Sequence, residues 1–242
     1  MAVSDLESLW REPDVPAVGA VPPALEFVDV FKIYRSGPVE TVALRGLSFR
    51  VEQGELVAVL GPSGCGKSTM LALAAALDEP SAGEVRVGAR SLQRLDDGEL
   101  AVYRSHQLAL VFQSENLWPA LTARENVAAA VSLAGYPDPG SAADAALARF
   151  GLADRGAHRA GALSGGEQQR VAIAAAYARG ASLVLADEPT GELDSRNEAV
   201  VFDALAQLSS DSGSTVIVVT HSARVAAAAG RVLEVRDGRM CR

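Results

Sequence analysis

The sequence contains very little lysine. Of its 22 basic residues, 20 are arginine, and the only lysines are Lys32 and Lys67. The net charge at pH 7 is −8. A protein that binds nucleic acid usually presents a basic face, so this balance argues against a nucleic-acid partner. The arginine-rich chain nevertheless has Lys67 inside a glycine-rich loop, where a compact ammonium on a flexible stem fits.

Other absences exclude further classes of protein. The two cysteines, Cys65 and Cys241, predict no disulfide framework, and no cluster of cysteine and histidine predicts a zinc site. No uncharged apolar run approaches the roughly 18 residues that a membrane span needs. The N-terminus has no charged segment followed by an apolar one, so we expect no signal peptide. These features predict a soluble protein of a reducing, cytosolic compartment.

The 242 residues suit one domain with an additional lobe. Residues 1–24 contain four prolines and little periodicity, and we expect a mobile leader there. From Leu25 onward, short apolar runs with strand composition alternate with helical patterns, which predicts an α/β fold with a buried parallel sheet. Alanine-rich helical patterns from about residue 114 to 178 predict an inserted helical lobe.

The segment LVAVLGPSGCGKST has the pattern of a phosphate-binding loop. It matches the pattern G-x-x-x-x-G-K-[ST] through Gly61, Gly66, Lys67 and Ser68, and an apolar strand precedes it. A helix from Lys67 to about Leu77 is expected to follow. Backbone amides of the loop can wrap the β- and γ-phosphates, and Lys67 can neutralise the phosphate oxygens. Ser68 can offer its hydroxyl to Mg²⁺.

The segment SLVLADEPT has two acids at the end of an apolar run. An apolar strand ends at Asp187, which can lie beside the metal. Glu188 follows, and its carboxylate can orient the attacking water and accept its proton. A guanine base is not favoured, because neither lysine lies in an Asn-Lys-x-Asp box. An aromatic face can hold adenine instead, and Tyr34 is the candidate platform.

A second glycine turn lies in GALSGGEQQRVAIA. Ser164 and Glu167 have the S-x-x-E spacing of a capping box, which predicts a helix start whose amides Gly165 and Gly166 leave exposed. The turn contains no lysine, and it lies about a hundred residues after the first loop. On the residues alone, it is either a well-capped helix start or a second contact for a phosphate.

The order of these motifs resembles that of the nucleotide-binding subunits of ABC transporters, and the match covers residues 25–240. LSGGE matches the family signature, which is specific when it lies between a phosphate loop and an acid-ended strand. Gln113 matches the glutamine loop, Leu193 and Asp194 match the loop that crosses the dimer interface, and His221 matches the switch histidine.

Two segments narrow the resemblance within the family. LADEPTGELDS and ENLWPALTARENV resemble the branch that contains macrolide exporters, lipoprotein-release systems and cell-division systems. Two residues depart from that branch. Glu192 stands where asparagine is more common, and Trp118 stands where an aliphatic residue is usual.

The resemblance implies a P-loop ATPase core with an antiparallel β subdomain and an inserted α-helical subdomain over residues 25–242. It implies a head-to-tail homodimer, in which the LSGGE turn of one subunit covers the γ-phosphate held by the other. ATP and Mg²⁺ are the implied cofactors. An integral-membrane permease is the implied partner, which would hold the subunit at the cytoplasmic face of the cell membrane. The implied site consists of the catalytic residues Glu188, His221 and Gln113, the metal ligands Ser68, Gln113 and Asp187, and nucleotide contacts at Tyr34, Gly61, Pro62, Ser63, Gly64, Cys65, Gly66, Lys67, Ser68, Thr69, Ser164, Gly165, Gly166 and Asp194.

Two other functions stay open on the sequence. A soluble ABC ATPase that acts on DNA, ribosomes or protein complexes tends to carry two fused cores, long coiled coils or zinc modules, and this sequence has one core and no sustained heptads. A nucleotide-gated scaffold would bind ATP but scarcely hydrolyse it, and the presence of Glu188 and His221 argues against that function. The transported substrate is not readable here, because the permease is a different chain.

Overall fold

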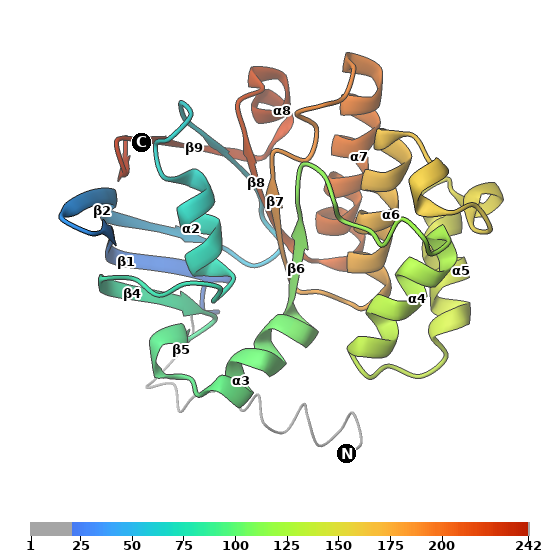
Figure 1. Ribbon diagram of the computed structural model, residues 1–242, viewed down its shortest axis with the longest axis horizontal. Helices are drawn as coiled ribbons and strands as arrows, with labels where there is room; N and C mark the ends of the chain where they lie inside the picture. The colour runs from blue at the N-terminus through green and yellow to red at the C-terminus, as the bar shows by residue number, and fades with distance from the viewer. Residues whose placement is uncertain (1–20, 242) are drawn as a thin grey trace.

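The computed structural model describes residues 21–241, in which two β-sheets are flanked by helices (Figure 1). The mobile leader expected over residues 1–24 lies almost entirely outside the described residues. The first strand, β1 (Leu25–Ser36), begins where that leader is expected to end. Within the described part of the chain, no helix is both long and apolar enough to cross a membrane.

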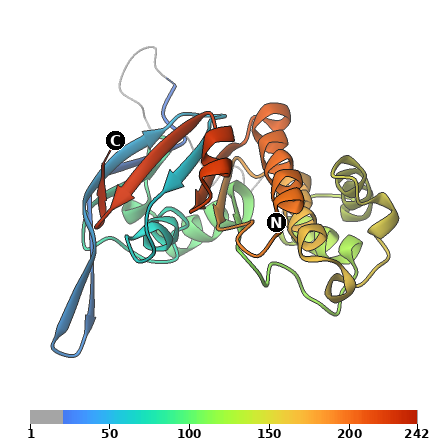
Figure 2. The same ribbon diagram turned by 90° about the horizontal axis from the view of Figure 1, so that it is seen from above.

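The smaller sheet is antiparallel, with the strand order β2-β1-β4-β5. Besides β1 it contains β2 (Val39–Val51), β4 (Ala82–Val87) and β5 (Arg90–Ser91). β1 and β2 form a long hairpin that projects from the body of the molecule (Figure 2). Phe27 and Phe49 stack across this hairpin with their ring centroids 4.8 Å apart. This sheet confirms the antiparallel β subdomain that the family resemblance predicts.

The larger sheet has the strand order β10-β9-β3-β8-β7-β6, and all its pairs are parallel except β9 with β10. Because parallel strands bring their carboxyl ends to one edge, the residues at and just after the ends of β3, β7 and β8 meet there. Those residues are the phosphate loop, the Asp187–Glu188 pair and His221. The strands are β3 (Leu56–Leu60), β6 (Leu108–Val111), β7 (Leu183–Asp187), β8 (Thr215–Thr220), β9 (Arg231–Arg236) and β10 (Arg239–Met240).

Helices cover the larger sheet and extend beyond it on one side (Figure 1). α4, α5 and α6 pack against one another, and they fall within the range of the predicted lobe. The helices are α2 (Lys67–Ala74), α3 (Asp97–Val102), α4 (Ala123–Leu133), α5 (Pro139–Arg149), α6 (Gly165–Ala178), α7 (Ser195–Ser212) and α8 (Ala223–Ala228), with 3-10 turns at Leu92–Arg94, Ala153–Arg155 and Ala160–Ala162 and a π turn at Tyr103–Gln107.

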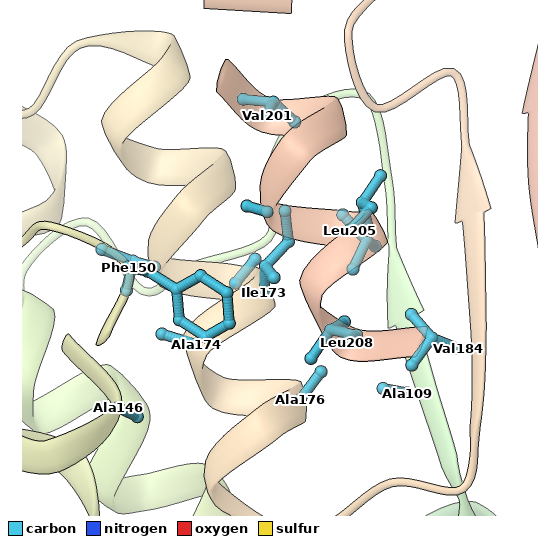
Figure 3. Packing of buried hydrophobic residues seen from close by; sticks show 14 of the residues in the cluster. Ala109, Ala146, Phe150, Ile173, Ala174, Ala176, Val184, Val201, Leu205 and Leu208 are labelled. Carbon is cyan, nitrogen blue, oxygen red and sulfur yellow. The ribbon is translucent and has the colours of Figure 1, made fainter. Parts of the chain in front are cut away.

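The two faces of the larger sheet pack against different helices. Along β7, Leu183 and Leu185 point into the cluster that contains α2 and the antiparallel sheet. Val184 and Ala186 point into the opposite cluster, which contains α6 and α7. The alternation follows from the two-residue period of a strand, and it leaves α2 and α6 on opposite faces. Figure 3 shows the second cluster from close by, with Ala174 and Ile173, Leu205 and Leu208, and Val184.

The helix after the phosphate loop is shorter than the sequence predicts. The expected helix from Lys67 to about Leu77 ends at Ala74 instead. The chain reverses there because Ala76 adopts a left-handed conformation with φ 51°. The amide of Leu77 then donates a hydrogen bond to the carbonyl oxygen of Ala72 at 2.9 Å. This closure resembles the C-terminal turn that glycine usually makes, so the alanine-rich sequence concealed it.

Candidate nucleotide-binding and hydrolysis site

The phosphate loop leaves backbone donors free for an anion. Gly66 precedes the first turn of α2 with φ 105°, and no side chain caps this helix. Amides of the first turn of α2 can therefore bind phosphate oxygens, whose charge the helix dipole also favours. Pro62, Ser63 and Gly64 are exposed along the loop. Gly64 adopts φ 77°, in the region that favours glycine.

Close packing also requires glycine at both ends of the loop. A Cβ atom on Gly61 would lie 2.2 Å from the carbonyl oxygen of Val235 and 2.6 Å from the Sγ atom of Cys65. A Cβ atom on Gly66 would lie 2.6 Å from the carbonyl oxygen of Ala43. Both distances to backbone are shorter than any tolerated contact. A side chain at either position would therefore displace the loop from the strands that support it.

Lys67 is the first residue of α2, directly after the loop, and is buried. Its Nζ atom donates hydrogen bonds to the carbonyl oxygens of Gly61, at 2.7 Å, and of Pro62, at 3.0 Å. Cys65 Sγ lies 3.9 Å from the same ammonium. The loop thus holds a positive charge inside the ring of backbone groups. Thr69 follows on α2 and is partly buried.

Ser68 and Asp187 line one cleft of about 160 Å³ between α2, β6 and β7. The rest of its lining is apolar and includes Phe112. A hydroxyl and a carboxylate are the oxygen ligands that Mg²⁺ prefers, and Mg²⁺ commonly takes only one or two protein ligands together with phosphate oxygens. In residues 21–241, no group of three or more His, Cys, Asp and Glu side chains could hold a metal by itself. The pair therefore fits Mg²⁺ that arrives with a phosphate.

Glu188 and His221 meet at the same edge of the sheet. Glu188 Oε2 lies 2.9 Å from His221 Nδ1, and the backbone amide of His221 donates to the same oxygen at 3.3 Å. Glu188 adopts φ 47°, an uncommon conformation for a residue with a side chain. The backbone amide of Glu188 donates to the carbonyl oxygen of Val219 at 2.9 Å, which fixes the turn. The carboxylate is thus held at the end of β7, beside β8.

Gln113 lies near these acids but does not line the cleft of Ser68 and Asp187. Its Nε2 atom lies 3.4 Å from Glu192 Oε1. A Cβ atom on Gly191 would be 3.1 Å from the same nitrogen. The structure therefore brings Gln113 against the segment that follows Glu188, rather than beside Ser68. Glu192, which departs from the related branch, is the acceptor for Gln113.

The second glycine turn forms the predicted helix start. Ser164 Oγ accepts from the amide of Glu167 at 3.3 Å, and Glu167 Oε2 accepts from the amide of Ser164 at 2.9 Å. Arg155 also donates to Glu167, at 2.8 Å. The hydrogen bond from Arg155, followed by the bond from the Ser164 amide, lowers the pKa of Glu167 to about 2. The capping box is therefore built around a carboxylate that stays ionised.

The two glycines of this turn face the segment after β7. A Cβ atom on Gly165 would be 3.3 Å from Leu193 Cδ2, and one on Gly166 would be 3.1 Å from Asn197 Oδ1. Asp194 lies between these contacts and caps α7. Its carboxylate accepts hydrogen bonds from the amides of Asn197, at 2.9 Å, and Arg196, at 3.1 Å. These bonds, that from Asn197 first, hold the pKa of Asp194 below its ordinary value.

Tyr34 lies on β1 with 41% of its surface exposed. Its hydroxyl donates to Asp78 Oδ2 at 3.0 Å. Lys32 Nζ lies 4.9 Å from the centre of the Tyr34 ring and donates to Asp78 Oδ1 at 2.5 Å and to the carbonyl oxygen of Glu79 at 2.7 Å. Burial alone would raise the pKa of Asp78, but its hydrogen bonds, that from Lys32 first, lower it. The segment after α2 thus fixes the tyrosine.

Sequence reasoning missed two amides that hold the loop containing Gln113. Gln169, on α6, is 4% exposed and donates to two carbonyl oxygens of that loop. Asn116 closes the loop on itself and also reaches Gln169. One signal in the sequence points to Gln169. It lies four residues before Ile173, so a polar side chain occupies the buried face of the helix.

The capping box predicts a pH effect on stability. Because the pKa of Glu167 is about 2 in the folded chain, below its ordinary 4.5, its charge stabilises the fold above pH 4.5. That contribution is lost as the pH falls from 4.5 toward 2. Glu167→Gln should lower the unfolding free energy by about 1 kcal/mol at pH 7. Urea unfolding should then show that the unfolding free energies of Glu167→Gln and the unmodified chain converge at acid pH. A constant difference, or an equal effect of the exposed-loop variant Glu115→Gln, would contradict this account.

Known proteins share these features. The sequence profile described as "ABC transporter" matches residues 44–191. The lipoprotein-releasing system ATP-binding protein LolD of Geobacter metallireducens is 43% identical over 218 residues, which cover 89% of this chain and 97% of LolD. The macrolide export ATP-binding/permease protein MacB of Rhodopseudomonas palustris is 47% identical over 207 residues. These cover 85% of this chain but only 32% of MacB, so the chain spans a small part of that relative.

A solved structure has the same fold. The dimeric structure of MJ0796, described as a bacterial ABC transporter cassette, superimposes with a TM-score of 0.82 at 39% sequence identity. The superposition covers 90% of this chain and 97% of the cassette. A second solved structure of the same cassette is described as a dimeric post-hydrolysis state bound to ADP and phosphate. With the profile, the relatives and the fold in agreement, the chain belongs to the ABC transporter family.

Proposed function

We propose that this chain is the ATP-binding and ATP-hydrolysing subunit of a membrane transporter complex, and that it works as a homodimer with two ATP molecules. The observation that carries the proposal is the meeting of three groups at one sheet edge. These groups are the uncapped helix start behind the phosphate loop, the Ser68–Asp187 cleft, and the Glu188–His221 pair.

Binding of ATP would use the phosphate loop and Tyr34. Lys67 exchanges a carbonyl partner within the loop for phosphate oxygens, which a charged donor binds more strongly. Tyr34 stacks on adenine. Ser68 and Asp187 would hold Mg²⁺ with the phosphates, where the ion would supply positive charge beside the γ-phosphate. Gln113 would bind the metal through Oε1, which is not the atom that contacts Glu192, and because Gln113 does not line the cleft of Ser68 and Asp187, its metal role requires a movement of the side chain.

Hydrolysis would use the pair at the ends of β7 and β8. Glu188 accepts a proton from the water whose oxygen attacks the γ-phosphorus, and ADP leaves as phosphate forms. His221 holds the carboxylate through its ring and its backbone amide. This arrangement supports hydrolysis over a scaffold that only binds ATP, because such a scaffold needs no positioned base.

The second glycine turn would act on the partner subunit's ATP. α2, which begins at the phosphate loop, and α6, which begins at the LSGGE turn, pack against opposite faces of the larger sheet. The two turns of a chain thus belong to different layers of its fold, and a two-fold dimer would bring the LSGGE turn of each chain to the other chain's phosphate loop. The dimeric cassettes with the same fold support this arrangement.

The permease would dock beside the glutamine loop, at the cytoplasmic face of the membrane. Trp118 is 54% exposed, and its backbone is fixed because its amide donates to Asn126 Oδ1 at 2.8 Å. A large aromatic side chain on a rigid backbone is a common anchor of interfaces. The named relatives are ATP-binding proteins of lipoprotein release and macrolide export, which favours the same branch of exporters here over a soluble ABC ATPase.

Replacement of Glu188 separates binding from hydrolysis. Glu188→Gln keeps the shape of the side chain but removes the base, so turnover should fall by 10²-fold or more while ATP still binds. ATP-bound dimers should accumulate and be visible by size-exclusion chromatography. Lys67→Ala should instead lose ATP affinity and form no such dimers. Normal turnover by Glu188→Gln would show that another group is the base.

Mixed dimers test the two-chain site. Gly165→Asp suits this test better than Gly166→Asp, because the near neighbour of Gly165 is the flexible end of Leu193 rather than a polar group of α7. Subunits with Lys67→Ala and subunits with Gly165→Asp should each be inactive alone. In a mixed dimer both defects fall on one composite site and the other site is intact, so ATP trapping should return. Verified mixed dimers that trap no ATP would refute the cross-subunit arrangement.

Docking through the tryptophan has its own test. Trp118→Ala should weaken assembly with the permease at least tenfold, because an exposed aromatic anchor is lost. ATP binding by the isolated subunit should be unchanged. Leu133→Ala is a matched control, because Leu133 is 73% exposed at the end of α4. An equal loss of ATP binding and assembly in Trp118→Ala would mean that the tryptophan supports the fold instead.

A further inference from the structure

A buried amide joins the loop of Gln113 to the helix of the LSGGE turn. Gln169, on α6, is 4% exposed. Its Nε2 atom donates hydrogen bonds to the carbonyl oxygens of Phe112, at 2.9 Å, and of Gln113 itself, at 2.6 Å. Its Oε1 atom accepts a hydrogen bond from Asn116 Nδ2 at 3.1 Å. Both ends of one side-chain amide are therefore committed to the loop that follows β6.

The loop is itself a closed ring. Asn116 Oδ1 accepts from the amide of Phe112 at 2.7 Å, and Asn116 Nδ2 donates to the carbonyl oxygen of Phe112 at 2.7 Å. Glu115 allows the tight return with φ 61°. The side chain of Asn116 thus pairs with Phe112 as a neighbouring strand would. Because the ring is closed, a displacement of Gln169 that pulls on the carbonyl groups of Phe112 and Gln113 moves the whole loop, including the backbone of Gln113, as one unit.

The other end of the connection is the LSGGE turn. Gln169 lies five residues after Ser164, so about one and a half helical turns separate it from the cap. α6 is stiff on both sides of Gln169, because the capping box closes its start and because Val171 and Ile173, which follow Gln169, are fully buried. A shift of α6 that left the loop behind would break the hydrogen bonds of the buried Gln169 amide and remove its donor from the carbonyl oxygen of Gln113, while the carbonyl oxygen of Phe112 would keep Asn116. The helix and the loop therefore move together.

We propose that Gln169 is a positioning residue that couples the two ATP sites of the dimer. The inference rests on the proposed function, in which the LSGGE turn of a chain closes on the partner's ATP while Gln113 serves the chain's own ATP. Closure of the turn on the partner's ATP shifts α6, and Gln169 carries that shift to the backbone of Gln113. Occupation of one site thereby sets the position of Gln113 at the other, which makes turnover cooperative in ATP.

The first experiment measures cooperativity in the full-length chain. Gln169→Leu keeps the approximate volume of the side chain but removes all three hydrogen bonds to the loop. The Hill coefficient for ATP hydrolysis should fall from between 1.5 and 2 in the unmodified chain, roughly the value for two coupled sites, to about 1. The dissociation constant for ATP should be measured at low protein concentration, where the chain is monomeric. It should differ by less than about twofold between Gln169→Leu and the unmodified chain.

Gln168→Leu is the matched control, because it is the same substitution one residue earlier. Gln168 donates to the carbonyl oxygen of Leu163, the first residue of the LSGGE turn, rather than to the loop of Gln113. It should retain the Hill coefficient of the unmodified chain. Asn116→Ala provides a second route if Gln169→Leu folds poorly. It opens the ring from the loop side without altering α6, and it should also lower the Hill coefficient.

Hydrogen exchange gives a readout that a purely structural role would not move. In a mixed dimer with one Lys67→Ala chain, ATP occupies only the other chain's loop. The LSGGE turn of the Lys67→Ala chain then contacts the partner's ATP, while the phosphate loop of the Lys67→Ala chain holds none. Its amides over residues 112–118 should become protected when ATP is added. The same chain carrying Gln169→Leu as well should show protection at the start of α6 but none over residues 112–118.

The outcomes separate the coupling from the proposed function. A chain that neither binds nor hydrolyses ATP would overturn both. Cooperative turnover that survives in Gln169→Leu and in Asn116→Ala would overturn the coupling alone. Protection over residues 112–118 that persists in Gln169→Leu would do the same. Loss of cooperativity and of this protection, with ATP affinity and thermal stability close to those of Gln168→Leu, would establish it.

Discussion

The close packing of the phosphate loop against the backbone of both sheets is the constraint on which the rest of the structure depends. Gly61 fits against the carbonyl oxygen of Val235 on β9, and Gly66 fits against the carbonyl oxygen of Ala43 on β2. The loop is thus wedged between the parallel and the antiparallel sheet. Gly238, after β9, makes the same close approach to Ala43 and donates its amide to the carbonyl oxygen of Cys65. Because no side chain fits at these contacts, the join of the two sheets and the shape of the loop are one feature.

The same sheet that seats the loop also separates it from the LSGGE turn. The alternation of β7 sends Leu185 toward α2 and Val184 toward α6, so the two glycine turns are tied to opposite faces. In the proposed dimer, each ATP site takes one glycine turn from each chain. Gln169 lies on the α6 side of the sheet, where it joins α6 to the loop that follows β6.

The sequence was sufficient for features that depend on local spacing. The strand and helix around GPSGCGKST, the capping box of Ser164 and Glu167, and the acids after β7 all follow from neighbouring residues. It was insufficient where contacts join distant segments. Gln169 reaches a loop more than fifty residues away, and the Asp78 that fixes Tyr34 follows a helix that ends at an unexpected left-handed alanine. Periodicity and motif spacing carry no information on such pairs, because the fold alone brings them together.

The scarcity of lysine acquires a physical meaning from these contacts. Lys67 donates to two carbonyl oxygens inside a tight loop, and Lys32 donates to a carboxylate and a carbonyl while lying over an aromatic ring. Each site surrounds a small cation with acceptors in several directions. A planar guanidinium directs its donors into one plane, whereas an ammonium directs three donors around an axis. The two lysines of an arginine-rich chain therefore lie where the shape of the cation matters, one where the proposed phosphates would bind and one behind the tyrosine that would carry the base.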